Sequence, residues 1–306
     1  MRSSRRLALG AMLLALLVGA CSSGGGSKPT IKIGSVGFDE ARVMAEVYAQ
    51  ALEANGYTID RAGIGLGARP VVAPAIESGQ IDLQPEYIGS RLSYWGGTPT
   101  GDSEANFNAV QQLANGKNLT FLRYTPAVDT NAFVVRAETA AQFSLATLSD
   151  AAAVQDQLKW GLAQDCPTNA LCGAPGGALE QYGITSATIA GATLLSACDT
   201  PMADALKNGT IDVAELCSTQ PDILVNGWVI LADDKHTQPA DNVAPLVRND
   251  LLAKVGDRTA FDKILNDVSA QIDTATLADL YKQVAVDHKD AKDVAAAWLR
   301  AKGFIP

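Results

Sequence analysis

One phrase occurs twice in this chain, at positions far apart in the sequence. Residues 75–83 read AIESGQIDL and residues 205–213 read ALKNGTIDV. Each copy looks like the end of a helix at a glycine, because glycine readily adopts the left-handed conformation of a helix cap. The pair Ile-Asp then leads into an apolar strand. Two such units predict two similar α/β lobes with a cleft between them.

The first copy continues directly into Pro85-Glu86-Tyr87-Ile88-Gly89. We expect the strand to end at Pro85, because proline has no N–H with which to continue a ladder. In an open α/β layer, ligands bind in the crevice beyond such strand ends. Residues 81–89 therefore become the first candidate for a binding site.

Composition and charge limit the class of protein. The chain has 306 residues, of which 47% are apolar, so it can bury a large core in one or two domains. Its net charge of −9 leaves no basic footprint for nucleic acid or for anionic lipid. The two histidines, His236 and His288, are far apart in the sequence, so we expect neither a metal site nor a cofactor.

The N-terminus has the features of an export signal. Three arginines (Arg2, Arg5 and Arg6) precede an apolar run over residues 7–18, which is too short to span a bilayer comfortably. Residues 18–21 then resemble a bacterial lipobox, which predicts a signal peptide over residues 1–21 that ends at a lipidated Cys21. An ordinary signal peptide that happens to contain a cysteine is the alternative. The flexible tether over residues 22–29 favours the lipoprotein, anchored to the outer face of the cell membrane.

Four further cysteines fit an exported protein, where an even number usually indicates disulfides. We expect Cys166 to pair with Cys172 and Cys198 with Cys217, because each bond closes a local loop. A metal site is the competing interpretation. However, the spacing is not that of a zinc site, and no histidine lies nearby.

The order of predicted elements indicates two lobes. In the first lobe we expect strands at 31–36 and 57–63, a turn at 65–67, helices at 39–55, from Pro70 to 79 and at 103–115, and a loop at 91–101. In the second lobe we expect strands at 130–135, 158–162 and 211–216, and helices at 177–182 and 202–207. The chain is expected to cross at 121–125 and to return at 225–231, followed by a strand at 244–247 and helices at 259–270, 276–286 and 290–302. The strand–helix alternation is typical of parallel sheets. We therefore predict lobe one at residues 30–126 plus 232–306, and lobe two at 127–231.

Sequence motifs of enzymes are missing. The chain contains no Gly-x-Ser-x-Gly, no His-Glu-x-x-His and no Walker loop, and the glycines of residues 63–67 lack the dinucleotide-binding spacing. Asp233 and Asp234 could act as paired acid and base, but an acidic pair beside Lys235 is more typical of a solvated surface. We therefore expect a binding protein and not an enzyme.

Several phrases together resemble one family. Their order is 79–82 (GQID), 85–89 (PEYIG), 182–185 (YGIT), 208–212 (NGTID), 231–235 (LADDK) and 244–248 (APLVR). This set resembles the substrate-binding proteins of osmoprotectant ABC importers, the glycine betaine/carnitine/choline type known as ProX or OpuC-like. The resemblance implies an α/β, two-lobed periplasmic-binding-protein (type II) clamshell with two hinge crossings. It also implies a monomer that delivers a small solute to membrane permease subunits.

The resemblance also implies a ligand and its contacts. In that family a quaternary ammonium lies in a cage of tyrosines, because ring faces attract a cation that cannot donate hydrogen bonds. Tyr87 matches a cage tyrosine, but where the family has a second tyrosine this chain has Asn131, and Thr219-Gln220 replaces the usual Thr-Asp. The candidate ligand-binding residues are Phe38, Arg69, Glu86, Tyr87, Asp129, Thr130, Asn131, Thr219 and Gln220.

Three alternatives stay open at this stage. The same fold could transport a non-quaternary polar or phenolic solute, because Asn131 replaces a ring. It could carry a small-molecule enzyme, which would need a titratable cluster in the cleft. A sensor or adhesin lipoprotein would instead bind a protein partner without hinge closure.

Overall fold

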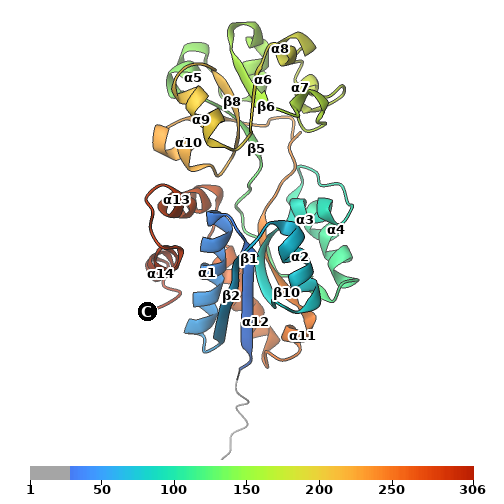
Figure 1. Ribbon diagram of the computed structural model, residues 1–306, viewed down its shortest axis with the longest axis vertical. Coiled ribbons are helices and arrows are strands. Elements are labelled where there is room, and N and C mark those ends of the chain that lie inside the picture. Colours follow the sequence, from blue (N-terminus) through green and yellow to red (C-terminus); the bar gives the residue numbers. More distant parts are fainter. Residues whose placement is uncertain (1–27) are drawn as a thin grey trace, which may run out of the picture.

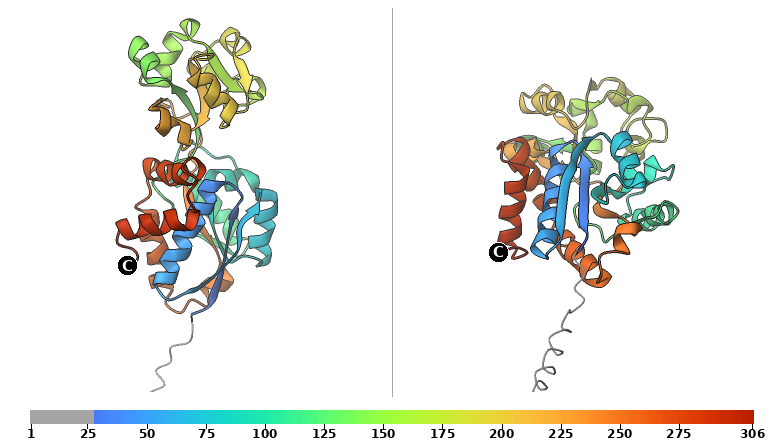
Figure 2. Two further views of the ribbon diagram at one scale, coloured as in Figure 1. Left: turned by 60° about the vertical axis from the view of Figure 1, so that its left-hand side comes forward. Right: turned by 60° about the horizontal axis from the view of Figure 1, so that its bottom comes forward.

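A computed structural model describes residues 28–306 of the chain, and it contains two α/β lobes joined by two extended segments (Figure 1). Each lobe is built on one five-stranded mixed sheet, with the strand orders β2-β1-β3-β10-β4 and β7-β6-β8-β5-β9. Helices cover the sheets, and the two lobes meet at the connecting segments and where α10 contacts α13 (Figure 2). The predicted two-lobed clamshell is confirmed.

The sheet of the first lobe combines the N-terminal strands with one strand that returns late in the chain. Its strands are β1 (Thr30–Val36), β2 (Thr58–Gly67), β3 (Leu83–Tyr87), β4 (Leu119–Phe121) and β10 (Val243–Arg248). Strand β1 runs parallel to β2 and β3, which is the predicted β-α-β-α-β arrangement. Strand β10 is antiparallel to both β3 and β4.

Helix α1 (Asp39–Ala54) is the central helix of this lobe, because most of its residues are buried. It packs against β1 and β2 on one side and against the C-terminal helices α12, α13 and α14 on the other. The lobe's other helices are α2 (Arg69–Ser78), α3 (Ile88–Tyr94), α4 (Ser103–Asn115), α11 (Asn249–Leu252), α12 (Arg258–Ser269), α13 (Thr274–Ala285) and α14 (Ala291–Ala301).

The second lobe is smaller, and its sheet has an apolar cluster on each face. Its strands are β5 (Asn131–Val135), β6 (Trp160–Ala163), β7 (Thr193–Leu195), β8 (Val213–Cys217) and β9 (Val229–Leu231). Its helices are α5 (Ala137–Phe143), α6 (Leu148–Ala153), α7 (Ala178–Gln181), α8 (Ser186–Ala190), α9 (Thr200–Lys207) and α10 (Pro221–Asn226), with 3-10 turns at Gln155–Gln157 and Cys166–Thr168. Along β5, Phe133 and Val135 enter one cluster while Ala132 and Val134 enter the other, as the two-residue period of a strand requires.

The repeated phrase performs the same structural task in both lobes. Gly79 and Gly209 have φ values of +83° and +73°, so each helix ends in the left-handed conformation expected for glycine. Asp82 then exchanges two hydrogen bonds with the backbone of Lys32, at 2.7 and 3.0 Å. Asp212 makes the same two bonds to Lys159, at the same distances. The phrase therefore locks a helix end to the start of the neighbouring strand, once in each lobe.

We expected strand β3 to end at Pro85, but it continues through Pro85 and Glu86 to Tyr87. The reason is its partner: Pro85 lies opposite Pro245 of β10 in the antiparallel register. Neither proline has an N–H, so they form a pair in which no hydrogen bond is exchanged, and the neighbouring pairs form the ladder. The carbonyl of Pro245 points the other way and accepts from Leu122 N at 2.9 Å.

Strand β2 also continues beyond its predicted end, through the expected turn at 65–67. The β1–β2 register shifts twice along this stretch, between Lys32 and Gly34 and between Gly34 and Val36. Gly65 and Gly67 adopt φ values of +72° and +148°, which let the strand absorb these irregularities.

Two other predicted segments are wrong. The loop expected at 91–101 begins inside helix α3, whose first amides are capped by a residue far away in the sequence, as described below. The return crossing expected at 225–231 falls instead within the second lobe. There α10 is followed by β9, which pairs with β5.

The two connecting segments touch each other where they leave the first lobe. Val128 and Asn242 form an antiparallel bridge, and Asp129 N donates to the carbonyl of Asp241 at 3.0 Å. The side chain of Asn242 donates to the carbonyls of Thr125 and Ala127. This contact places residues 127–130 and 239–242 side by side at the hinge.

Both predicted disulfides are confirmed: Cys166 is bonded to Cys172, and Cys198 to Cys217. The first lies buried in the second lobe. Between residues 28 and 306, no helix has the length and apolar character needed to cross a membrane.

Candidate functional site

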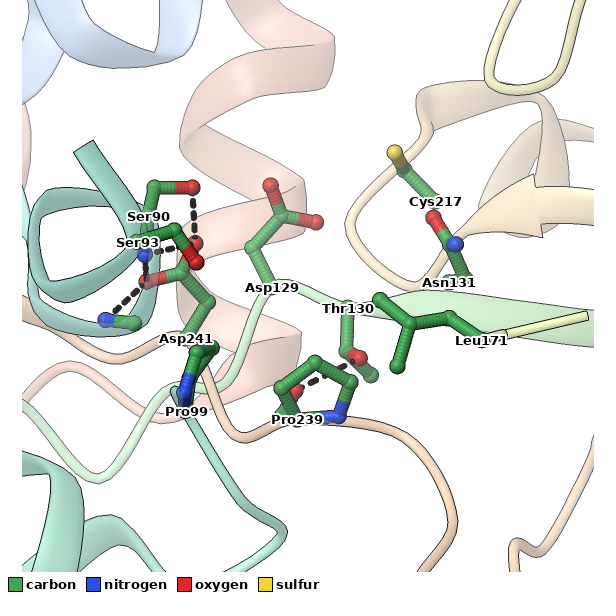
Figure 3. Close-up of a pocket in the computed structure, with 11 residues that line it drawn as sticks. Ser90, Ser93, Pro99, Asp129, Thr130, Asn131, Leu171, Cys217, Pro239 and Asp241 are labelled. Carbon is green, nitrogen blue, oxygen red and sulfur yellow. Dashed lines mark hydrogen bonds between the residues drawn. The ribbon is translucent and has the colours of Figure 1, made fainter. Parts of the chain in front are cut away.

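A pocket of about 270 Å³ lies beside the hinge, between the first turns of α3 and the start of β5 (Figure 3). Its walls come from the first lobe, from both connecting segments and from the second lobe. The lining residues are Gly89, Ser90, Ser93, Pro99, Asp129, Thr130, Asn131, Leu171, Cys217, Pro239 and Asp241. A change in the angle between the lobes would therefore change the shape of this pocket.

Asp241, on the second connecting segment, holds the start of helix α3. Its carboxylate accepts hydrogen bonds from Gly89 N at 2.7 Å, from Ser90 N at 3.1 Å and from the Ser90 hydroxyl (Figure 3). It thus replaces the N-terminal capping residue that the local sequence does not supply. Burial raises the pKa of Asp241 to about 6, although these hydrogen bonds and Arg69 act in the opposite direction.

Asp129, on the first connecting segment, is the second carboxylate of the pocket. One of its oxygens accepts from the Thr219 hydroxyl at 3.0 Å, which ties the first connecting segment to the second lobe just after β8. Burial and the nearby Asp241 raise the pKa of Asp129 to about 6. Because both segments of the hinge carry a carboxylate here, negative charge is concentrated where the lobes pivot.

Glu40, in the first turn of α1, is the third carboxylate of this cluster. It is only 1% exposed, and its Oε1 accepts a hydrogen bond from the Tyr87 hydroxyl. Its Oε2 is buried and has no hydrogen-bond partner among residues 28–306. Burial, followed by the charge of Asp129, raises the pKa of Glu40 to about 8. We refer to Glu40, Asp129 and Asp241 below as the hinge carboxylates.

Three aromatic side chains lie around the hinge carboxylates. Phe38, which precedes α1, is 46% exposed and has its ring centroid 5.7 Å from that of Tyr87. Tyr87 itself is almost fully buried in the core of the first lobe. Tyr281, on α13, has a pKa raised to about 12 by burial and then by its acidic neighbours, beginning with Glu40. Phe38 and Tyr281 are therefore the rings that a ligand could reach here.

The structure separates the predicted site residues into two groups. Asp129, Thr130 and Asn131 line the pocket, and Thr219 contacts Asp129. The Thr130 hydroxyl donates to the carbonyl of Pro239 at 2.8 Å, across the two connecting segments (Figure 3). Gln220 is buried and donates to Asp222 instead.

Glu86 and Arg69 belong to an ion-pair network in the first lobe. Glu86 is buried and binds Arg91 at 2.7 Å and Arg69 at 3.0 Å. Arg91 is fully buried. Neither Glu86 nor Arg91 lines the pocket. Their ion pair therefore stabilises β3 and helix α3.

Other candidates fall outside the pocket. Asp233 accepts hydrogen bonds from Tyr182, Thr237 and Gln238, so it organises a turn of the second lobe. Asp234 is exposed and accepts from the Ser149 hydroxyl at 2.6 Å. Cys21, the predicted lipidation site, lies outside the described residues.

Four residues of the site were not predicted from the sequence: Glu40, Asp241, Ser90 and Tyr281. Glu40 looked like one of two acids in a helix's first turn, and Asp241 like one residue of a proline-bearing loop. The pairing of two segments more than a hundred positions apart brings Asp241 beside Asp129.

Taken together, the pocket has a marked charge preference. Among the described residues, those lining it include two partly buried carboxylates but no lysine, no arginine and no aromatic ring. Hydroxyl and amide groups of Ser93, Thr130 and Asn131 supply neutral polarity. The arrangement is suited to a small polar solute with positive charge.

Comparisons with known proteins agree with this geometry. The chain is 28% identical to the glycine betaine-binding protein YehZ of Escherichia coli, over 90% of this chain and 91% of that protein. It is also 28% identical to a glycine-betaine-binding protein of Pseudomonas aeruginosa, covering 92% of this chain and 91% of that protein.

Solved structures support the same fold. A glycine betaine/carnitine/choline ABC transporter structure superposes with a TM-score of 0.79 at 22% identity, covering 90% of this chain and 99% of that chain. Apo YehZ of Escherichia coli superposes with a TM-score of 0.78 at 26% identity, with the same coverage. The family described as the substrate-binding domain of ABC-type glycine betaine transport systems matches residues 29–301, and the chain belongs to that family.

Proposed function

We propose that this protein captures a small ammonium osmoprotectant, of the betaine or choline type, in the interlobe pocket and presents it to the permease of an ABC importer. The observation that carries the proposal is the position of the pocket. It is lined by both connecting segments and by both lobes, with partly buried carboxylates at the pivot. The names of the relatives, which refer to glycine betaine and carnitine, support the same class of ligand.

In this proposal, closure of the lobes tells the permease that a ligand is bound. A ligand that contacts the first lobe through Ser90 and the second through Asn131 binds the closed form better than the open form. It therefore shifts the equilibrium between them, and the permease recognises the closed form. We assign the first rigid body to residues 30–126 plus 243–306 and the second to residues 131–238, which moves the boundary expected at 232 because Tyr182 holds Asp233 to the second lobe. We expect the protein to act as a monomer.

The roles of individual residues follow from their positions. Asp129, with Thr219, supplies negative charge for the ammonium group, and Phe38 offers an exposed ring face. Thr130 and Asn131 contact the ligand's polar end. Tyr87 acts indirectly, by holding Glu40. Residues 1–21 direct export, and lipidation of Cys21 anchors the protein outside the cell membrane.

Thermal unfolding with a panel of solutes tests the proposal. A ligand present at a hundred times its dissociation constant stabilises the folded state by about 2.7 kcal/mol. For a protein of this size, that raises the melting temperature by roughly 5–10 °C. We expect such a rise with choline or a betaine. A rise produced only by sugars or phenols would contradict the proposal, as would no rise with any ammonium compound.

A further inference from the structure

Glu40 is the feature of the site that remains unexplained. A buried carboxylate oxygen without a partner is unfavourable, because burial removes water and nothing replaces it. Tyr87 satisfies Oε1, but Oε2 has no partner in the described part of the chain. The Thr219 hydroxyl approaches Glu40 as well, yet its single proton is donated to Asp129. Oε2 is therefore a buried acceptor without a donor, in the neighbourhood of Thr219 and Asp129.

A proton on Glu40 resolves this conflict in the empty protein. Protonation removes the negative charge from the unpartnered Oε2, while Tyr87 still donates to Oε1 and the Thr219 hydroxyl still donates to Asp129. Two further facts agree. Burial raises the pKa of Glu40 to about 8, and the next largest cause is the charge of Asp129. The site therefore holds a proton where a ligand's positive charge would be expected.

The titratable groups around Glu40 are mostly acidic, so they favour a cation beside it. The titratable groups that face it or its close neighbours are Asp39 beside it on α1, Tyr87 on β3, Asp129 and Asp241 on the connecting segments, and Tyr281 on α13. Asp222 of α10 acts on Tyr281. The one basic group in this set is Arg69, which acts on Asp241 and is itself bound to Glu86.

We propose that the pocket takes an organic ammonium cation without a carboxylate group, and that Glu40 becomes its buried counter-ion by releasing a proton as the ligand enters. The proton passes to the solvent, so a neutral carboxyl plus a cation becomes an ion pair plus a solvated proton. This inference rests on the proposed function, and it narrows the ligand from ammonium solutes in general to those of choline type. A zwitterion brings a carboxylate toward Asp129 and Asp241, where no basic residue lines the pocket among the residues described.

Titration calorimetry of the purified protein with choline tests the exchange. Experiments in two buffers with different ionisation enthalpies count the protons released. We expect close to one at pH 7, where Glu40 is mostly protonated but Asp129 and Asp241, with pKa values of about 6, are mostly ionised. Between pH 6 and 8, affinity should increase by up to about tenfold per pH unit.

Two variants sharpen the test. Glu40→Gln has no proton to release, so its choline affinity should be weaker and nearly independent of pH. The matched control is Glu215→Gln, because Glu215 is an equally buried carboxylate with a raised pKa, bonded to Ala163 N in the second lobe. This variant should release as many protons as the unchanged protein. If Glu40→Gln does not fold, the proton count of the unchanged protein decides alone.

The outcomes separate the two proposals. Choline binding without proton release, or a proton count unchanged in Glu40→Gln, overturns the exchange at Glu40. Glycine betaine should bind at least tenfold more weakly than choline, and equal affinity overturns the ligand class while leaving the transport function intact. If no ammonium compound binds at any pH, the proposed function itself fails.

Discussion

Protonation of Glu40 should make the empty protein less stable as the pH rises. Glu40 has an ordinary pKa of 4.5 in the unfolded chain and about 8 in the folded protein. A carboxyl whose pKa is raised by folding binds its proton more tightly in the folded state. Its stabilising contribution is therefore complete below pH 4.5 and is lost as the pH rises through 8. Asp129 and Asp241 contribute similarly, but in a lower window that ends near pH 6.

Between pH 6 and pH 8, the change in stability with pH is therefore due mainly to Glu40. Each pH unit over which the folded state holds one extra proton costs about 1.4 kcal/mol, and the dependence levels off near the folded pKa. The expected loss between pH 6 and pH 8 is about 2 kcal/mol. For a chain of this length, that corresponds to a decrease of roughly 4–8 °C in melting temperature.

Calorimetric unfolding of the ligand-free protein and of Glu40→Gln measures this effect. The variant keeps the shape and the Tyr87 contact but cannot titrate, so its melting temperature should change little over the same interval. Glu215→Gln serves as the control and should keep the Glu40-dependent decrease. Equal slopes for Glu40→Gln and the unchanged protein between pH 6 and pH 8 would refute the reasoning.

Three further predictions concern other parts of the molecule. Asp129→Asn should weaken choline binding at least tenfold, because it removes a carboxylate at the pivot; unchanged affinity in titration calorimetry would exclude Asp129 from the site. Arg91→Met should lower the free energy of unfolding by up to about 3 kcal/mol, since the buried Glu86 loses its fully buried arginine partner and keeps only Arg69; adding Glu86→Gln should recover part of this loss in urea titrations, and no recovery would contradict the ion-pair account. Replacing Cys198 and Cys217 by serine opens a loop with a sequence separation of 19 and should lower the free energy of unfolding by about 3 kcal/mol; an unchanged urea midpoint would show that the disulfide adds nothing.

Much of the fold could be predicted from local sequence patterns. The repeated phrase identified two related lobes because Gly79 and Gly209 end helices, while Asp82 and Asp212 lock them to the next strand. These are short-range relationships. They depend on residues close to each other in the sequence or in the adjoining strand, so the pattern is readable without the structure.

The errors arose where distant segments decide the local conformation. Helix α3 extends into the stretch where a loop was expected, and Asp241 supplies its cap from the second connecting segment. Strand β3 passes through Pro85 because Pro245 lies opposite. Neither relationship can be inferred from residues 81–101 alone.

The same distinction between short-range and long-range relationships applies to the candidate site. Asp129, Thr130 and Asn131 were found because they follow a crossing and occupy the positions of a family phrase from which Asn131 departs, and all three line the pocket. Glu40 and Asp241 were missed because their importance comes from burial and, for Glu40, also from the charges of Asp129 and Asp241, and no local motif encodes either property.

Small-angle X-ray scattering, with and without saturating choline, tests the central claim most directly. The account holds that a solute enters between the lobes and that the hinge at Val128 and Asn242 lets them close on it. It predicts a smaller radius of gyration in the presence of choline, with no change on addition of a sugar. An identical scattering curve with and without choline, at a concentration where calorimetry shows binding, would contradict closure around the ligand.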